Sequence, residues 1–123
     1  MPSPSIAVPA ARLSVLVVDP NKLNRLLVRN ALQRGGHVVH GVDTIDEALA
    51  ALASHRPDRL LIDATAEHPR LAALLSSFAP AQIIAMTTKQ ARLAERVWKP
   101  RGVDAILTKP ILVSRLMKAL QPV

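Results

Sequence analysis

The sequence predicts an α/β fold, a doubly wound parallel sheet of five strands built from five successive strand–helix units. Two observations carry this prediction. Short, almost wholly apolar runs recur along the chain, and runs of this kind are typical of strands buried on both faces. Between them lie longer segments whose apolar residues repeat at helical spacing. Such alternation indicates a parallel sheet with helices on both faces.

The chain has the size of one domain, 123 residues, and half of these residues are hydrophobic. We expect the domain to cover residues 12–123, after a disordered lead-in over residues 1–11. The absence of cysteine excludes disulfide bonds and suits a reducing cytoplasm, where we expect the protein to act. No apolar run approaches the roughly 20 residues that span a bilayer, and the N-terminus lacks the features of a signal peptide.

The first strand and helix are predicted from the start of this domain. Residues 13–18 are almost wholly apolar, and this strand ends at Asp19. Residues 21–34 follow with an apolar stripe at i, i+3, i+4 and i+8, which indicates a helix. Gly35 and Gly36 end it, because glycine readily adopts the left-handed conformation that stops a helix.

The second unit begins with a strand over residues 37–42. Thr44 can cap the helix that follows, and Glu47, three residues later, completes a capping box. This helix stops before Pro57, because the residue preceding a proline disfavours helical geometry.

The same alternation continues through the second half of the chain. We expect strands over residues 59–62, 82–86 and 103–107, and helices over residues 69–78, 89–99 and 111–120.

Four predicted strands are followed by polar residues that bear chemistry: Asp19, Asp63, Thr87 and Lys109. In a parallel α/β sheet such residues converge at one edge, where ligands bind. A carboxylate there can attack a phosphoryl group and hold it as an acyl phosphate. A lysine and a hydroxyl can stabilise the charge on the phosphoryl oxygens, and carboxylates supply the hard oxygen ligands that Mg²⁺ prefers.

Residues 13–120 resemble the receiver domains of two-component response regulators. The resemblance rests on four segments that occur in the expected order along the chain. These are VLVVDPN at residues 15–21, RPDRLLID at 56–63, IIAMTT at 83–88 and GVDAILTKP at 102–110.

The resemblance implies a flavodoxin-like fold with the strand order 2-1-3-4-5. It also implies that Asp63 is the phosphoacceptor, that Thr87 is the phosphate-sensing hydroxyl, and that Lys109 contacts the phosphoryl group. Asp19 and Asp63 would then bind Mg²⁺.

The chain departs from the family pattern at three places. Pro20 stands where the family has a second acid that binds the metal directly, so we expect a magnesium site that is weak or absent. Ile106 replaces the aromatic switch residue. The loop over residues 64–69 lacks the usual Met-Pro and Asp-Gly pairs, and its Glu67 can in principle reach the site.

The last third of the chain is strongly basic. Eight basic and two acidic residues lie between Lys89 and Lys118, a local excess of +6 within a formal charge of +7. A candidate anionic nucleotide patch lies in this segment, because guanidinium groups bind phosphate and an indole can stack on a base. Its members are Arg92, Arg96, Trp98 and Arg101. The alternative is that Trp98 packs under the last strand and that the arginines are only solvated.

Two functional hypotheses follow, and neither is an enzyme. The first is a stand-alone receiver in a phosphorelay, which accepts a phosphoryl group on Asp63 from a histidine kinase or phosphotransfer protein and acts by contact with a downstream protein. The second is a phosphorylation-independent pseudo-receiver that binds cyclic di-GMP, another anionic nucleotide or a partner protein through its basic fourth helix. DNA binding is disfavoured, because no recognition helix or second module is predicted.

Overall fold

The computed structural model describes residues 12–64, 69–78 and 82–120. The lead-in predicted over residues 1–11 lies outside this part of the chain. The strands are β1 (Ser14–Val18), β2 (Val38–Val42), β3 (Arg59–Asp63), β4 (Gln82–Thr87) and β5 (Ala105–Thr108). The helices are α1 (Lys22–Arg34), α2 (Ile45–Ser54), α3 (Leu71–Phe78), α4 (Ala91–Trp98) and α5 (Val113–Leu120), with a 3₁₀ turn, η1 (Lys99–Arg101), after α4.

All five strands form one parallel sheet in the order β2-β1-β3-β4-β5. The predicted fold class and the strand order implied by the family resemblance are therefore confirmed. The order reverses after β1, so β1 and β3 lie side by side at the centre, with Val18 paired to Ile62. A crevice beyond the carboxyl ends of the strands at such a reversal is the usual ligand site of this architecture.

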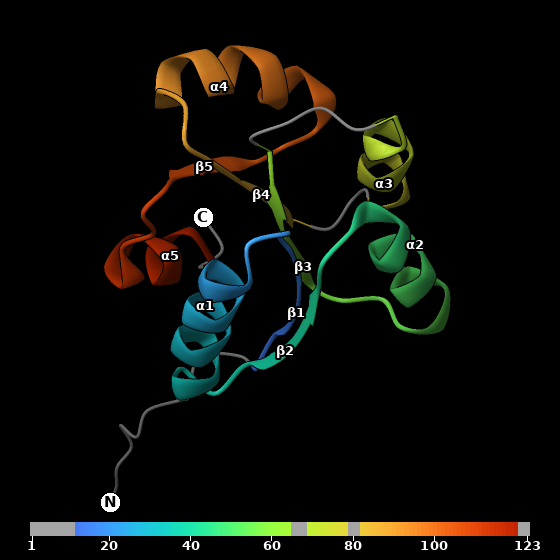
Figure 1. Cartoon of the computed structure of the whole chain (residues 1–123), viewed down its shortest axis with the longest axis vertical. Helices are drawn as coiled ribbons and strands as arrows, with labels where there is room; N and C mark the ends of the chain where they lie inside the picture. The colour runs from blue at the N-terminus through green and yellow to red at the C-terminus, as the bar shows by residue number, and fades with distance from the viewer. Residues whose placement is uncertain (1–11, 65–68, 79–81, 121–123) are drawn as a thin grey trace, which may run out of the picture.

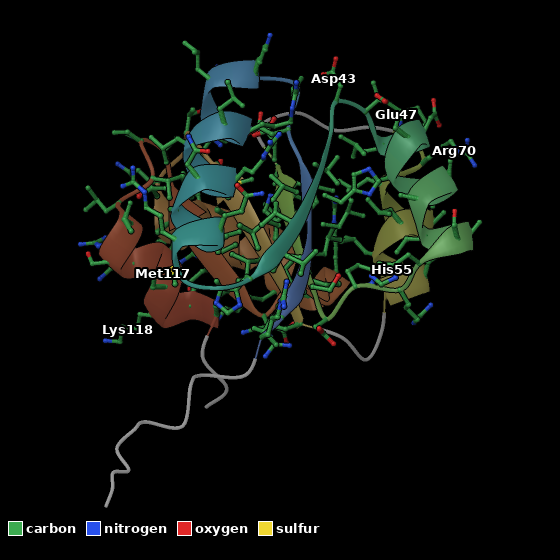
Figure 2. The ribbon with its side chains drawn as sticks, turned by 90° about the horizontal axis from the view of Figure 1, so that it is seen from below. Asp43, Glu47, His55, Arg70, Met117 and Lys118 are labelled. Atoms are coloured by element: carbon green, nitrogen blue, oxygen red, sulfur yellow. The ribbon has the colours of Figure 1, made fainter. Side chains whose placement is uncertain are left out.

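Helices cover both faces of the sheet (Figure 1). Alternate residues of β1 point to opposite faces: Val15 and Val17 pack with α1 and α5, whereas Leu16 and Val18 pack with α2, α3 and α4. Figure 2 shows the consequence, since Lys118 of α5 and Glu47 of α2 lie on opposite sides of the sheet. The core is almost entirely aliphatic, and the inner strands β1, β3 and β4 are buried along most of their length, whereas the edge strand β2 is largely exposed.

The ends of the first two helices follow the local sequence. Thr44 caps α2, because its Oγ1 accepts the backbone N–H of Glu47 at 3.1 Å and its hydroxyl donates to the Glu47 carboxylate at 3.2 Å. After α1, Gly36 adopts the left-handed conformation at φ 89°. The Thr44 cap and the glycine stop predicted from the sequence are thus confirmed, whereas Glu47 accepts the Thr44 hydroxyl instead of the backbone N–H that a capping box requires.

Three predicted elements of the last third begin later than expected, among them α5, which starts at Val113 rather than at residue 111. Helix α4 begins at Ala91 rather than at Lys89, so Lys89 belongs to the preceding loop. Strand β5 begins at Ala105 rather than at residue 103, because Asp104 uses its backbone N–H and its carboxylate to bind both backbone groups of Ile83. Within the described ranges, no helix is long and apolar enough to cross a membrane.

Candidate functional site

Two carboxylates and an ammonium group meet at the carboxyl edge of the sheet. The Nζ atom of Lys109, just after β5, lies 2.9 Å from Oδ2 of Asp19 and 3.3 Å from Oδ1 of Asp63. The side chain of Asp19 is 0% exposed, that of Asp63 12% and that of Lys109 16%. Lys109 therefore bridges a fully buried acid and an acid at the solvent boundary, as the convergence of the strand ends predicted.

Asp19 is enclosed by the first turn of α1. Its Oδ1 accepts the backbone N–H of Asn21 at 2.8 Å, and its Oδ2 accepts the side-chain amide of Asn24 at 2.6 Å. Its backbone carbonyl accepts Nη1 of Arg25 at 2.7 Å. Asp19 is thus satisfied by protein donors on both carboxylate oxygens, which explains how a carboxylate can be buried here.

Asn24 and Arg25 were not identified from the sequence. Both are polar residues that follow Asp19 within the first two turns of a helix otherwise rich in leucine. Their position in the first turns of this helix is the signal that could have identified Asn24 and Arg25. A helix that starts directly after a strand places its first residues close to the end of that strand. Arg25 also lies 3.5 Å from Asp43, the residue that follows β2.

Thr87 lies at the same edge, at the end of β4 beside Thr108 of β5. It is 1% exposed, and its backbone carbonyl accepts the N–H of Lys109 at 2.7 Å. Its Oγ1 accepts the backbone N–H of Lys89 at 3.0 Å. The hydroxyl therefore connects the site to the turn that leads into α4.

The positions that depart from the family pattern lie around this cluster. Pro20 is exposed directly after Asp19 and has no oxygen in its side chain. Ile106 is half-buried and packs against the apolar core beneath α2, α3 and α4. Glu67 lies outside the described residues. Within the described ranges, no group of three acidic, histidine or cysteine side chains could hold a metal ion.

The four members of the candidate nucleotide patch differ in their exposure to solvent. Arg92, Arg96 and Arg101 are exposed, whereas Trp98 is only 5% exposed and packs in the core beside Ala94. The guanidinium carbon of Arg101 lies 4.8 Å from the centroid of the indole ring and covers it. The indole is thus a core side chain, and the surface of the patch consists of its three arginines.

The arrangement at the sheet edge has a definite chemical capacity. Asp63 presents a carboxylate at the solvent boundary, and a carboxylate can act as a nucleophile toward phosphorus. Lys109 places a positive charge 3.3 Å from it, where negative charge develops during phosphoryl transfer. On its other side this ammonium group lies 2.9 Å from the carboxylate of Asp19.

Comparison with known proteins gives a consistent result. A family model described as the response regulator receiver domain matches residues 15–121. The polar-differentiation response regulator DivK of Brucella anthropi is 27% identical over 116 residues, which cover 88% of this chain and 93% of the relative.

Solved structures show the same similarity. The chemotaxis protein CheY4 of Vibrio cholerae is 27% identical, with a TM-score of 0.80 over 90% of this chain and 98% of that chain. The signal receiver domain of a modulated diguanylate cyclase from Desulfovibrio desulfuricans G20 is 26% identical, with a TM-score of 0.75 over 89% of this chain and 91% of that chain.

Proposed function

This chain belongs to the response regulator receiver domain family, and from this premise we propose that it accepts a phosphoryl group on Asp63 within a two-component phosphorelay. The observation that supports the assignment best is the contact between the carboxylate of Asp63 and the ammonium group of Lys109 at 3.3 Å. The carboxylate of Asp19 has no exposed surface, whereas that of Asp63 is partly exposed to solvent and so can be reached by a phosphoryl donor.

The proposed step is a displacement at phosphorus. A carboxylate oxygen of Asp63 forms a bond to the phosphorus atom while the bond to the donor breaks. With a phosphohistidine donor, the electron pair of the P–N bond stays on the imidazole nitrogen, which takes up a proton. Lys109 stabilises the charge on the transferred oxygens, and the product is an acyl phosphate on Asp63.

The donor in this proposal is a histidine kinase or a phosphotransfer protein, and the output is contact with a downstream protein. Thr87 would report the phosphoryl group, since its hydroxyl already touches the turn that leads into α4. Ile106 cannot rotate as an aromatic switch would, so the signal would pass through this turn. Action in the cytoplasm, without membrane or DNA contact, remains a prediction.

Receiver domains typically bind Mg²⁺, but the donors present here do not fit a tightly held ion. Asp19 already uses both oxygens on Asn21, Asn24 and Lys109, and Pro20 supplies no ligand. Mg²⁺ has strict octahedral demands and needs carboxylates that are available to it. We therefore include in the proposal that Mg²⁺ binding is weak or absent.

A second candidate is a phosphorylation-independent pseudo-receiver that binds an anionic nucleotide such as cyclic di-GMP, or a partner protein. The exposed side chains of Arg92, Arg96 and Arg101 favour it, because exposed guanidinium groups attract phosphate. The burial of Trp98 argues against it, since no indole face is offered for stacking. This observation leaves the phosphoryl acceptor as the better supported function.

One experiment separates the two candidates. The wild-type chain is incubated with acetyl phosphate over a range of Mg²⁺ concentrations, and its intact mass is recorded. In parallel, its binding to cyclic di-GMP is measured by calorimetry. A gain of one phosphoryl group without heat of nucleotide binding supports the acceptor, and the reverse result supports the pseudo-receiver.

A further inference from the structure

Asn24 connects three parts of the site. Its side-chain amide donates to Oδ2 of Asp19 at 2.6 Å and lies 3.7 Å from the sulfur of Met86 on β4. Its backbone N–H donates to the side chain of Asn21, the residue that caps α1. Asn21 in turn donates its own N–H to Asp19 at 2.8 Å. The backbone of Asn24 is therefore fixed by Asn21, and its side-chain NH₂ group is directed at the carboxylate of Asp19.

The oxygen that Asn24 contacts is the same one that Lys109 contacts. Oδ2 of Asp19 accepts the amide at 2.6 Å and lies 2.9 Å from Nζ of Lys109. Two donors thus share one carboxylate oxygen in a place without solvent, where each contact is stronger than in water. The second contact of the ammonium group is Oδ1 of Asp63, at 3.3 Å.

This sharing should limit how strongly Oδ2 of Asp19 attracts the ammonium group. An Asp19 carboxylate without the amide would offer all of Oδ2 to Lys109 and draw the ammonium group toward the buried acid. With the amide in place, Lys109 remains between Asp19 and Asp63. The other cation near Asp19, Arg25, binds its backbone carbonyl and approaches Asp43, so it does not compete for Oδ2.

We infer that Asn24 is a positioning residue, which holds the ammonium group of Lys109 beside Asp63 by sharing the carboxylate of Asp19. The effect of Asn24 on phosphoryl transfer rests on the proposed function, because the position of Lys109 matters most when Asp63 takes up a phosphoryl group. The shared contact of Asn24 and Lys109 with Asp19 is present in the chain without any phosphoryl donor.

The test compares Asn24→Asp with Asn30→Asp. Both substitutions add the same charge to α1, but Asn30 is exposed on the helix. Asn24→Asp keeps the shape of the side chain and exchanges a donor for an acceptor beside Asp19, so the ammonium group should move away from Asp63. Asn24→Ala and Asn30→Ala form a second pair, in which no charge is added.

The readout is NMR of the side chains of Lys109 and Asp63, at fixed pH and without phosphodonor. Both Asn24 variants should shift the Lys109 Nζ and Cε resonances and the Asp63 carboxyl resonance, and both Asn30 variants should leave them unchanged. The inference would be overturned if the Lys109 and Asp63 resonances were the same in the Asn24 variants as in the Asn30 variants.

Labelling of Asp63 by acetyl phosphate is measured on the same samples. Because small displacements of a positioned group cost large factors in rate, labelling of the Asn24 variants should be slower by about ten-fold or more than that of the Asn30 variants. Equal rates would also overturn the inference. If the wild-type chain takes no label, the proposed function fails, whereas the NMR comparison still decides the role of Asn24.

Discussion

The ammonium nitrogen of Lys109 lies 2.9 Å from Oδ2 of Asp19, a carboxylate with no exposed surface. Removing this partner leaves a buried charge without its cation. We predict that Lys109→Met lowers the free energy of unfolding by about 3 to 5 kcal/mol, as expected for breaking a buried ion pair. Chemical denaturation measures the loss, and Lys118→Met, an exposed lysine of α5, is the control. Equal stability of the two variants would show that Asp19 does not depend on Lys109.

Pro20 follows Asp19 and is exposed at the edge of the site. We predict that Pro20→Asp strengthens Mg²⁺ binding, because it adds a carboxylate where the wild-type chain has no ligand. Calorimetric titration with Mg²⁺ measures the change. Pro20→Asn is the matched control, since it has nearly the same shape without the charge. Wild-type binding as tight as that of Pro20→Asp would contradict the weak site.

Thr87 and Thr88 are adjacent, but Thr87 is buried and Thr88 is exposed. If Thr87 reports the phosphoryl group to α4, phosphorylation should change the fluorescence of Trp98, which lies at the end of that helix. We predict that Thr87→Ala still takes up label on Asp63 but loses this fluorescence change, whereas Thr88→Ala keeps it. The same fluorescence response in both variants would exclude Thr87 as the reporter.

Arg96 tests the second candidate function. If an anionic nucleotide binds at α4, Arg96→Ala should lose about 1.5 to 3 kcal/mol of binding free energy, which is about ten- to a hundred-fold in affinity. Binding should also weaken as salt rises. Calorimetry with cyclic di-GMP checks both, with Arg34→Ala at the end of α1 as a control of equal charge. No heat in the wild-type chain would leave the patch without a nucleotide ligand.

The positions of Asp19, Asp63, Thr87 and Lys109 could be predicted from the sequence because each is the last residue of a strand or comes directly after one. The periodicity of the chain locates strand ends, and the parallel arrangement brings these ends to one edge. The order of the strands could not be read in this way, since the same alternation is compatible with several orders. That order came from the resemblance to receiver domains.

The contacts of Asn24 could not be predicted, because they depend on how α1 packs over the sheet. Asn24 meets Met86, 62 residues away, only once β4 lies beneath the first turn of that helix. Trp98 was misleading for a different reason. Its basic neighbours suggested a surface position, whereas the i, i+4 pair that it forms with Ala94 is the buried stripe of α4.

The most direct test of the account is site-specific phosphorylation of Asp63. The wild-type chain, Asp63→Asn and Asp46→Asn are incubated with acetyl phosphate and Mg²⁺, and the acyl phosphate is located by mass spectrometry. Asp46 is an exposed aspartate of α2 that pairs with Arg70, so its substitution controls for the loss of one carboxylate. We predict label on Asp63 in the wild-type chain and in Asp46→Asn, and none in Asp63→Asn, because an amide is a poor nucleophile. Undiminished label in Asp63→Asn, or no label in the wild-type chain at any Mg²⁺ concentration, would contradict the account.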